Sequence, residues 1–475
     1  MPLVLGVDSS TQATKVEVRD ADSGRLVADG RAPHPPASPP RSEQDPEAWL
    51  RALAEAMDIA GVDPVAVAAV AVAGQQHGLV VLDTDGRPLR PAKLWNDTES
   101  APDAVALLDR LDGAGWARAC GSVPVPAMTV TKLAWLRRVE PTAYERVASV
   151  LLPHDFVTRS LVGTAVTDQG DASGTGYWSP ADRGWRHDLL ALVDPERDWA
   201  PLLPRVLGPT EAAGSWRGAL VGPGTGDNMA AALGLGLGPG DVAFSIGTSG
   251  TVFAVTETPT ADPSGAVAGF ADATGHYLPL VCTLNAAKVT DAAARLLGVD
   301  HAGLDALAEA APAGAGGLVL VPYLDGERTP NRPLASGTLA GIRSDVSREQ
   351  FASAAFEGVV CGLLDGFDAL AAAGVEAPGR VFLIGGGARS AAYRHVLADL
   401  LGRPVTVPAT AELVALGACA QAAAVLHGRP PGEVVAGWEL GPATVVEPDG
   451  SVDRTAVRAA YAEACAVSSD RGCAG

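Results

Sequence analysis

One pattern occurs twice in this chain, as LVLGVDSSTQATKVEV at Leu3–Val18 and as VAFSIGTSGTVFAV at Val242–Val255. In each copy an apolar strand leads into a short turn of hydroxyl and small residues, and a second strand follows. Such a turn gathers backbone N–H groups and hydroxyls at one point, which suits it to bind phosphate oxygens. We therefore predict a phosphate-binding hairpin at the start of each half of the chain, an arrangement that favours a phosphotransferase.

Length and composition indicate a large globular protein with an acidic surface. The chain has 475 residues, 47% of them hydrophobic and 19% charged, which predicts two or three domains with sizeable cores. Its formal net charge of −20 argues against nucleic-acid and anionic-membrane partners, because their phosphates would be repelled. An anionic nucleotide would therefore need local phosphate-binding turns and a metal ion.

The cysteines and the N-terminus favour a cytoplasmic protein. The six cysteines are scattered and form no CxxC pair, which suits neither a zinc site nor a disulfide framework. The first ten residues carry an Asp but no Lys or Arg, so we expect no signal peptide. No uncharged apolar run reaches the roughly 18 residues that a membrane-spanning helix needs.

Strand and helix patterns alternate along the chain, which predicts an α/β fold. We expect a helix that begins at Pro46 with Asp45 as its N-cap. The proline-rich segment 31–40 predicts a loop. The glycine-rich segment 222–240 indicates a boundary between two α/β domains, residues 1–230 and 231–475. Further strands are expected at 65–73, 80–82, 318–323 and 381–384, and further helices at 350–372, 390–401 and 455–466.

Two aspartates are candidates for phosphoryl-transfer chemistry. Asp8 lies directly before Ser9, Ser10 and Thr11, where a carboxylate could hold Mg²⁺ through water molecules. The alternative is that Asp8 only caps the turn. Asp227, in the sequence TGDNMAA, could be the general base that deprotonates an attacking hydroxyl. The alternative is that Asp227 is only a helix N-cap.

Two loops are candidates for ligand binding. The sequence GQQHG at Gly74–Gly78 follows a buried strand, and its glutamine and histidine side chains can bind several sugar hydroxyls. Without further context the histidine could equally lie in solvent. The sequence LIGGGARS at Leu383–Ser390 joins a strand to a helix through three glycines, which let a base or phosphate approach the backbone. Neither a P-loop nor a Rossmann fingerprint is present.

Taken together, these motifs resemble the FGGY carbohydrate kinases. The first family signature has a fair match around Thr129–Leu136, and the second has a full match at Gly337–Ile342 and on through Gln350–Glu357. Further motifs of the resemblance are SEQDPEAW (42–49), GQQHG (74–78), LWND (94–97), GDN (226–228), YLDGERTP (323–330) and IGGGARS (384–390). The resemblance covers residues 3 to about 425, nearly the whole chain.

The resemblance implies two ribonuclease-H-like domains, of the actin and hexokinase type, that face a central cleft. It implies that Asp227 is the catalytic base and that Asp8 lies by the metal and the phosphates. Sugar contacts are expected at Gln76, His77, Asp227 and Asn228. ATP contacts are expected at Ser9, Ser10, Thr11, Gly247, Thr248, Ser249, Gly385, Gly386, Gly387 and Ala388.

The sequence departs from the family pattern at three places, and none removes a catalytic group. The first signature continues as Arg137–Arg138, where the family more often has a polar or acidic residue. The first turn reads SSTQ, where many relatives have a glycine. Gln76 replaces the methionine of some relatives, which adds a hydroxyl contact.

The expected reaction is the phosphorylation of D-xylulose by ATP with Mg²⁺, giving D-xylulose 5-phosphate and ADP. One alternative is a kinase of the same family that acts on ribulose, gluconate or glycerol, because sugar choice depends on a few hydroxyl contacts. A second is a regulatory ATPase without sugar chemistry, against which stand Asp227 and the GQQHG loop. The only partners expected are the sugar and ATP, and a homodimer is compatible with the sequence.

Overall fold

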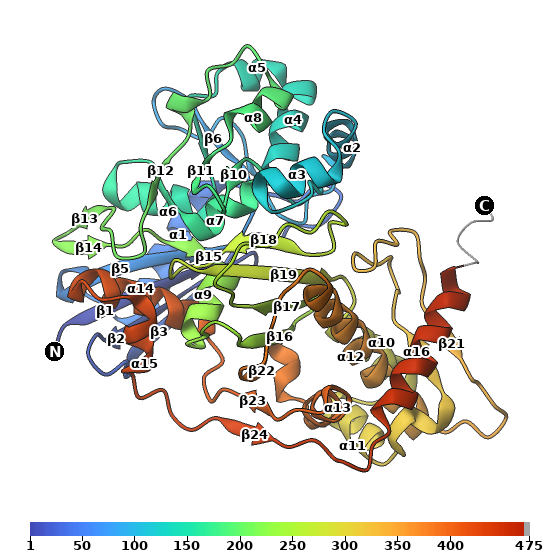
Figure 1. Cartoon of the computed structure of the whole chain (residues 1–475). Helices are drawn as coiled ribbons and strands as arrows, with labels where there is room; N and C mark the ends of the chain where they lie inside the picture. Colours follow the sequence, from blue (N-terminus) through green and yellow to red (C-terminus); the bar gives the residue numbers. More distant parts are fainter. Residues whose placement is uncertain (470–475) are drawn as a thin grey trace. The chain divides into compact units, whose positions relative to one another are not determined.

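The computed structural model describes residues 1–469, which form two compact units (Figure 1). Unit 1 comprises residues 1–238, 255–279 and 412–440, and unit 2 comprises 239–254, 280–411 and the chain from 441 onward. Two later segments of the chain therefore return to the unit that contains the N-terminus. The predicted division of the chain into 1–230 and 231–475 stays a prediction.

Unit 1 is built on a mixed sheet with the strand order β13-β14-β5-β1-β2-β3, in which β15 also pairs with β5. The first hairpin, β1 (Leu3–Ser9) and β2 (Ala13–Asp20), is antiparallel, whereas β5 (Val67–Gly74) runs parallel to β1, β14 and β15. The remaining strands of this sheet are β3 (Leu26–Pro33), β13 (Gly214–Trp216), β14 (Ala219–Val221) and β15 (Thr225–Gly226).

Helices cover both faces of this sheet. On one face, α1 (Pro46–Ala60) and α6 (Pro153–Val162) bury Trp49 and Phe156 against the valines and leucines of β1, β2 and β5. On the other face lie α9 (Asp227–Gly234) and α14 (Leu413–His427). A Cβ atom at Gly6 would lie 2.2 Å from the Ala415 carbonyl oxygen, so a glycine in β1 lets α14 approach the sheet.

A second core in unit 1 surrounds α4 (Thr129–Val139), the helix that carries the first family signature. Its buried residues include Trp116, Leu133, Trp135 and Tyr144. The other helices of unit 1 are α2 (Ala101–Leu108), α3 (Gly113–Cys120), α5 (Pro141–Glu145), α7 (Gln169–Ala172), α8 (His187–Val193) and α15 (Pro431–Ala436). Its short strands are β4 (Glu43–Gln44), β6 (Val80–Leu82), β7 (Ala92–Lys93), β8 (Ser149–Leu151), β9 (Val166–Asp168), β10 (Trp178–Ser179), β11 (Gly184–Trp185), β12 (Arg205–Leu207) and β18 (Ala268–Ala271).

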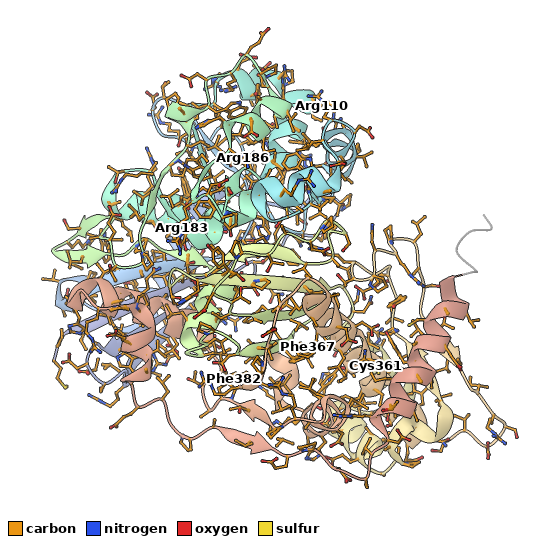
Figure 2. All side chains as sticks on the ribbon, viewed as in Figure 1. Arg110, Arg183, Arg186, Cys361, Phe367 and Phe382 are labelled. Carbon is orange, nitrogen blue, oxygen red and sulfur yellow. The ribbon has the colours of Figure 1, made fainter. Side chains whose placement is uncertain are left out.

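Unit 2 repeats the hairpin in its own sheet, where the strands run in the order β19-β17-β16-β22-β23-β24. β16 (Val242–Ile246) is antiparallel to β17 (Gly250–Ala254) and parallel to β22 (Val381–Ile384). Figure 2 labels Phe367, on α12 (Arg348–Ala372), and Phe382, on β22; the Phe367 ring packs 5.8 Å from that of Phe244. The other elements are β19 (Tyr277–Thr283), β20 (Val319–Val321), β21 (Thr338–Ala340), β23 (Val405–Val407), β24 (Thr444–Val446), α10 (Ala287–Leu297), α11 (His301–Glu309), α13 (Ala391–Leu401) and α16 (Arg454–Ser469).

The predicted α/β fold of the ribonuclease-H-like kinase type is confirmed, and most predicted elements lie within two residues of the observed ones. The Asp45 side chain caps α1 by accepting from the Glu47 N–H group, and Ser390 caps α13. The predicted loop 31–40 is wrong at its start, because β3 continues to Pro33. β3 is an edge strand, where a proline costs no ladder hydrogen bond.

The termini and cysteines add two observations. Cys120, Cys282, Cys361, Cys419 and Cys465 are free thiols, and Cys473 lies outside the described residues, as does the predicted short C-terminal end. No helix in residues 1–469 is both long enough and apolar enough to cross a membrane.

We predict that Gly417→Ala destabilises unit 1 by about 1–3 kcal/mol, the usual effect of overpacking. A Cβ atom at Gly417 of α14 would lie 1.9 Å from the Ala230 carbonyl oxygen of α9, so the two helices would have to separate. Thermal unfolding monitored by circular dichroism measures this change. The control is Gly432→Ala in α15, where a Cβ atom would meet nothing within 4 Å; a comparable loss in the control would contradict the packing argument.

Candidate active site

Three parallel strand ends bring the predicted sugar-binding and catalytic residues of unit 1 to one edge of its sheet. Gly74, the last residue of β5, pairs with Ser9 of β1 on one side and with Gly226 of β15 on the other. Asp8, the loop that begins at Gln75, and Asp227 therefore all lie at this edge. Carboxyl ends of parallel strands are where ligands bind in open α/β sheets.

Asp227 is the first residue of α9, and the N-cap is Gly226, so the interpretation of Asp227 as a helix N-cap is wrong. Its Oδ1 accepts hydrogen bonds from the Asn228 backbone N–H at 2.8 Å and from Asn228 Nδ2 at 3.0 Å. Burial, together with the charges of Asp8 and Asp171, raises the pKa of Asp227 to about 7. The side chain keeps some accessible surface, so a substrate hydroxyl can reach a carboxyl group whose pKa suits proton transfer near neutral pH.

The GQQHG loop faces Asp227 through its glutamines. Asn228 Nδ2 donates to Gln76 Oε1 at 2.7 Å, and Thr11 Oγ1 donates to Gln75 Oε1 at 3.2 Å. Within residues 1–469, Gln75 Nε2 and Gln76 Nε2 are buried and have no hydrogen-bond partner in the protein. Two amide donors are thus available to acceptor oxygens of a ligand.

His77 adopts a left-handed conformation, with φ of 62°. This conformation is uncommon for residues other than glycine and indicates a loop whose shape is fixed by its surroundings. Its ring lies 5.2 Å from that of Phe270, which comes from the segment 255–279 of the same unit. His77 is therefore held in a defined position, not extended into solvent.

Asp8 is almost fully buried in the first hairpin. Its Oδ1 accepts a short hydrogen bond from Ser10 Oγ, and its Oδ2 lies 3.6 Å from Lys15 Nζ. Lys15 also pairs with Glu412 at 2.5 Å. Burial raises the pKa of Asp8, and the Lys15 ammonium opposes that shift.

Sequence reasoning did not single out Lys15 or Trp95. The hairpin pairing places Lys15 directly opposite Asp8, and this register was the signal that could have found it. Trp95, in the LWND motif, donates from Nε1 to Thr11 Oγ1 at 2.9 Å, and the neighbouring Asn96 Oδ1 is buried with no partner among the described residues. Thr11 of the first hairpin therefore contacts both the LWND motif, through Trp95, and the GQQHG loop, through Gln75.

In unit 2, the parallel pairing of β16 with β22 brings together the two predicted ATP-binding loops. Ser245 pairs with Ile384, so the turn 247–249 and the loop 385–388 follow neighbouring strand ends. Gly385 has φ of 83°, and a Cβ atom there would lie 2.6 Å from the Ile246 carbonyl oxygen, so only glycine fits this close approach. Gly385 and Gly386 are exposed, and their backbone is open to a ligand.

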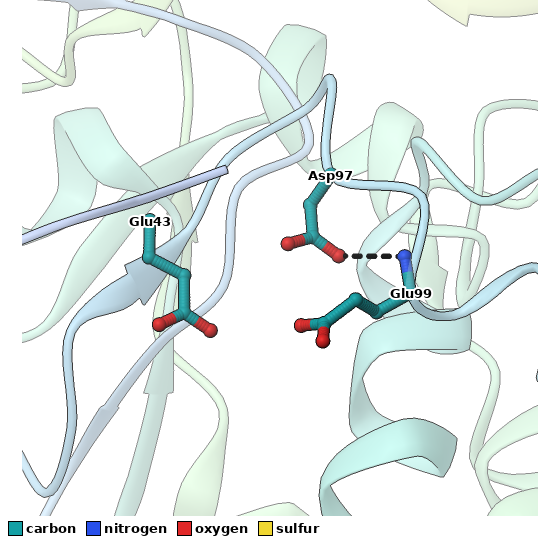
Figure 3. A group of neighbouring side chains, drawn as sticks. All are labelled: Glu43, Asp97 and Glu99. Atoms are coloured by element: carbon teal, nitrogen blue, oxygen red, sulfur yellow. Dashed lines mark hydrogen bonds between the residues drawn. The ribbon is translucent and has the colours of Figure 1, made fainter. Parts of the chain in front are cut away.

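Glu43, Asp97 and Glu99 form the one group of three acidic residues, within residues 1–469, whose oxygens lie close enough to hold a metal ion (Figure 3). The Lys93 ammonium already occupies that position. It lies 2.9 Å from Asp97, 2.6 Å from Glu99 and 3.2 Å from Glu43. The Trp135 ring covers it at 3.8 Å. These carboxylates therefore neutralise a buried lysine and form no metal site.

Comparison with known proteins agrees with this geometry. Residues 3–234 match the N-terminal domain and residues 242–426 the C-terminal domain of the FGGY family of carbohydrate kinases. The chain belongs to the FGGY family of carbohydrate kinases, enzymes whose phosphoryl donor is ATP.

Individual relatives show which kinases of this family the chain is similar to. The chain is 48% identical to the xylulose kinase of Streptomyces coelicolor over 94% of this chain and 92% of the relative. The crystal structure of xylulose kinase from Bifidobacterium adolescentis is 42% identical, covers 98% of this chain and 99% of its own, and superposes with a TM-score of 0.86. A gluconate kinase from Lactobacillus acidophilus superposes with a TM-score of 0.91 at 22% identity, covering 100% and 99% of the two chains, and shares the fold.

We predict that Lys93→Met destabilises unit 1 by about 3–5 kcal/mol, because it leaves the buried Asp97 carboxylate without its cation. The midpoint of urea unfolding measures the loss. The control is Lys288→Met, which removes the partly exposed Lys288–Asp325 pair and is expected to cost about 1 kcal/mol or less. A loss for Lys93→Met no larger than that for Lys288→Met would contradict the conclusion that Lys93 neutralises this cluster.

Proposed function

We propose that this chain transfers the γ-phosphate of ATP to D-xylulose and forms D-xylulose 5-phosphate and ADP. The observation that carries this proposal is the convergence of Asp227, Asn228 and Gln76 at one sheet edge, in a chain 48% identical to a xylulose kinase. We expect the enzyme to act in the cytoplasm, where ATP is available.

Asp227 is the proposed general base. Its carboxylate accepts the proton of the terminal sugar hydroxyl while the hydroxyl oxygen attacks the γ-phosphorus, and the bond to the ADP oxygen breaks. The two hydrogen bonds from Asn228 fix Oδ1, so Oδ2 is the oxygen available for the proton. A base positioned in this way contributes roughly 10²–10⁴ in rate.

Gln76, His77 and Asn228 are the proposed sugar-binding residues. The Gln76 carbonyl is already paired with Asn228, so its amide N–H groups are directed to the ligand. A sugar hydroxyl that satisfies a buried amide gains more than one that leaves the amide unpaired. Sugar binding and placement of the base are therefore connected through one side chain, Asn228.

Asp8 is the proposed Mg²⁺-facing residue. A single buried carboxylate fits an ion that keeps most of its water ligands, and Asp8 Oδ2 lies 3.6 Å from the Lys15 ammonium. The ion, when bound, neutralises charge on the phosphate oxygens. Lys15 supplies a second positive charge at the same hairpin.

Ser9, Ser10 and Thr11 of the first hairpin are proposed to bind the phosphates of ATP, as is the turn Gly247–Ser249. The loop Gly385–Ala388 is proposed to lie against the adenosine, because its exposed glycine backbone permits close approach of a flat base.

The test is sugar-dependent ADP release with Mg·ATP across D-xylulose, D-ribulose, L-ribulose, L-xylulose, gluconate and glycerol. We expect kcat/KM to be highest for D-xylulose. A preference for another sugar would overturn the proposed sugar choice, and no stimulation by any sugar would overturn the kinase function.

We predict that kcat/KM for D-xylulose falls about tenfold per pH unit below pH 7, because the base must be deprotonated and the pKa of Asp227 is about 7. Asp227→Asn should lower kcat by roughly 10²–10⁴ and abolish this acidic limb.

Asp29→Asn is the control for that variant, since Asp29 is an exposed carboxylate in β3. We expect wild-type rates and an unchanged pH profile from it. Near-normal turnover of a folded Asp227→Asn enzyme would rule out Asp227 as the base.

A further inference from the structure

A buried histidine lies behind the sheet edge just described, surrounded by three carboxylates. His154, near the start of α6, has no accessible surface. Its Nδ1 lies 2.7 Å from Asp171, and its Nε2 lies 3.1 Å from Asp155 and 3.9 Å from Asp168. Burial alone would lower the pKa of His154, but these three carboxylates outweigh it and raise the pKa to about 9. The three carboxylates thus favour the charged form of the imidazole.

One of these carboxylates reaches the sugar loop. The backbone N–H of His77, the residue with the left-handed conformation, faces the Asp171 carboxylate and favours its ionised form, against the effect of burial on its pKa. The turn that follows Asp171 also supports the His77 ring, since a Cβ atom at Gly174 would lie 2.2 Å from His77 Nδ1. The backbone and the ring of His77 thus both lie against the segment that His154 holds.

Another carboxylate reaches the turn that carries the base. Asp168 accepts a hydrogen bond from Thr225 Oγ1 at 2.7 Å, two residues before Asp227. It also caps α7 by accepting from the backbone N–H groups of Gly170 and Asp171, each at 2.9 Å. Asp168 therefore joins the base-bearing turn to the helix that carries Asp171.

The backbone around His154 is shaped to admit its side chain. A Cβ atom at Gly74 would lie 2.9 Å from the His154 Cβ, and one at Gly224, where φ is 79°, would lie 2.5 Å from its Cδ2. Gly74 precedes the sugar loop and Gly224 precedes Thr225. The imidazole is thus wedged against the two backbone segments that lead to the site.

We infer that His154 is a positioning residue, which through Asp171 and Asp168 fixes the sugar loop at Gln76–His77 relative to the base-bearing turn at Thr225–Asp227. This inference rests on the proposed function, since it concerns the placement of the base relative to the sugar. His154 touches neither reacting group. Its effect is geometric, and small displacements of a base or a substrate are costly in rate.

Removal of the His154 imidazole should let the sugar loop at Gln76–His77 move relative to the turn at Thr225–Asp227. In His154→Leu, Asp171 and Asp168 lose their shared partner, and we expect kcat/KM for the preferred sugar to fall about 100-fold. KM for ATP should stay within about twofold, because the proposed adenosine loop lies in unit 2 and the proposed phosphate contacts at Ser9, Ser10 and Thr11 belong to the first hairpin, not to the His154 network. A general loss of folded structure would not lower kcat/KM for the sugar while leaving KM for ATP unchanged.

Two milder variants keep the test decisive if His154→Leu fails to fold. In His154→Asn the side-chain amide can donate a hydrogen bond to Asp171 in place of Nδ1. We therefore expect kcat/KM for the sugar to be about tenfold higher than in His154→Leu. In Thr225→Val only the bond to Asp168 is lost. We expect kcat to fall about tenfold with the sugar KM within about twofold, because the base moves and the sugar loop does not.

The matched control is Thr158→Val, one turn further along α6. Thr158 is fully buried and its Oγ1 has no partner within residues 1–469, so the substitution alters the same helix and leaves the network intact. We expect wild-type kinetics from it.

The outcomes separate this inference from the proposed function. The sugar panel on the wild-type enzyme decides the function, and the ratio of each variant to wild type on the preferred sugar decides the role of His154. The inference is overturned if folded His154→Asn and Thr225→Val enzymes keep wild-type kcat and KM. It is equally overturned if their KM for ATP rises as much as kcat/KM for sugar falls, or if Thr158→Val loses as much activity.

Discussion

The parallel pairing of β5 with β1 and β15 is the constraint on which the site of unit 1 depends. Gly74 is paired on both sides, so the residues after β5 and those at the ends of β1 and β15 must emerge together. The register is enforced from the two faces of the sheet: Trp49 and Phe156 fill one side, and α14 contacts Gly6 on the other. A one-residue slip would exchange these faces and bury polar groups. The relative positions of the candidate site residues are therefore set by the packing of apolar residues on the two faces of the sheet.

Unit 1 contains two clusters in which a buried basic side chain lies among three carboxylates. At Lys93 one cation is surrounded by three carboxylates from a strand and a loop, and a tryptophan ring covers it. At His154 the imidazole is also surrounded by three carboxylates; of these, Asp171 faces the backbone N–H of His77, and Asp168 accepts a hydrogen bond from Thr225. Ionised groups of this kind add little net stability compared with apolar packing, although removing one partner is expensive. The second cluster is distinguished by its neighbours, because its carboxylates contact residues next to the proposed sugar loop and the proposed base.

The parts of the fold and site that the sequence predicted are those carried by contiguous motifs. The two hairpins, the GDN helix start and the glycine loop at 385–388 each contain their own turn chemistry, so a short stretch of residues specifies the local shape. Lys15 was predictable in principle, because strand pairing alone places it opposite Asp8. The His154 network was not, since its members come from α6, β9, α7 and β15 and no local pattern connects them. The return of α14 to unit 1 was likewise invisible: a helix apolar on all sides indicates burial, but not the sheet against which it packs.

Sugar choice must be decided by side chains, not by the fold. A gluconate kinase shares this architecture with a TM-score of 0.91 at only 22% identity, so the same backbone frame accommodates different sugars. Beside the candidate site, Gln75 Nε2, Gln76 Nε2 and Asn96 Oδ1 are buried and, within residues 1–469, have no hydrogen-bond partner in the protein. A buried donor or acceptor costs about 1–3 kcal/mol when a ligand fails to satisfy it. Two unsatisfied groups together cost more free energy than the presence or absence of one methylene group in a ligand. If the proposed sugar contacts at Gln76 and Asn228 hold, discrimination between pentuloses that differ at one hydroxyl follows from buried atoms that lack a protein partner, and the residues that position those atoms then matter as much as the atoms themselves.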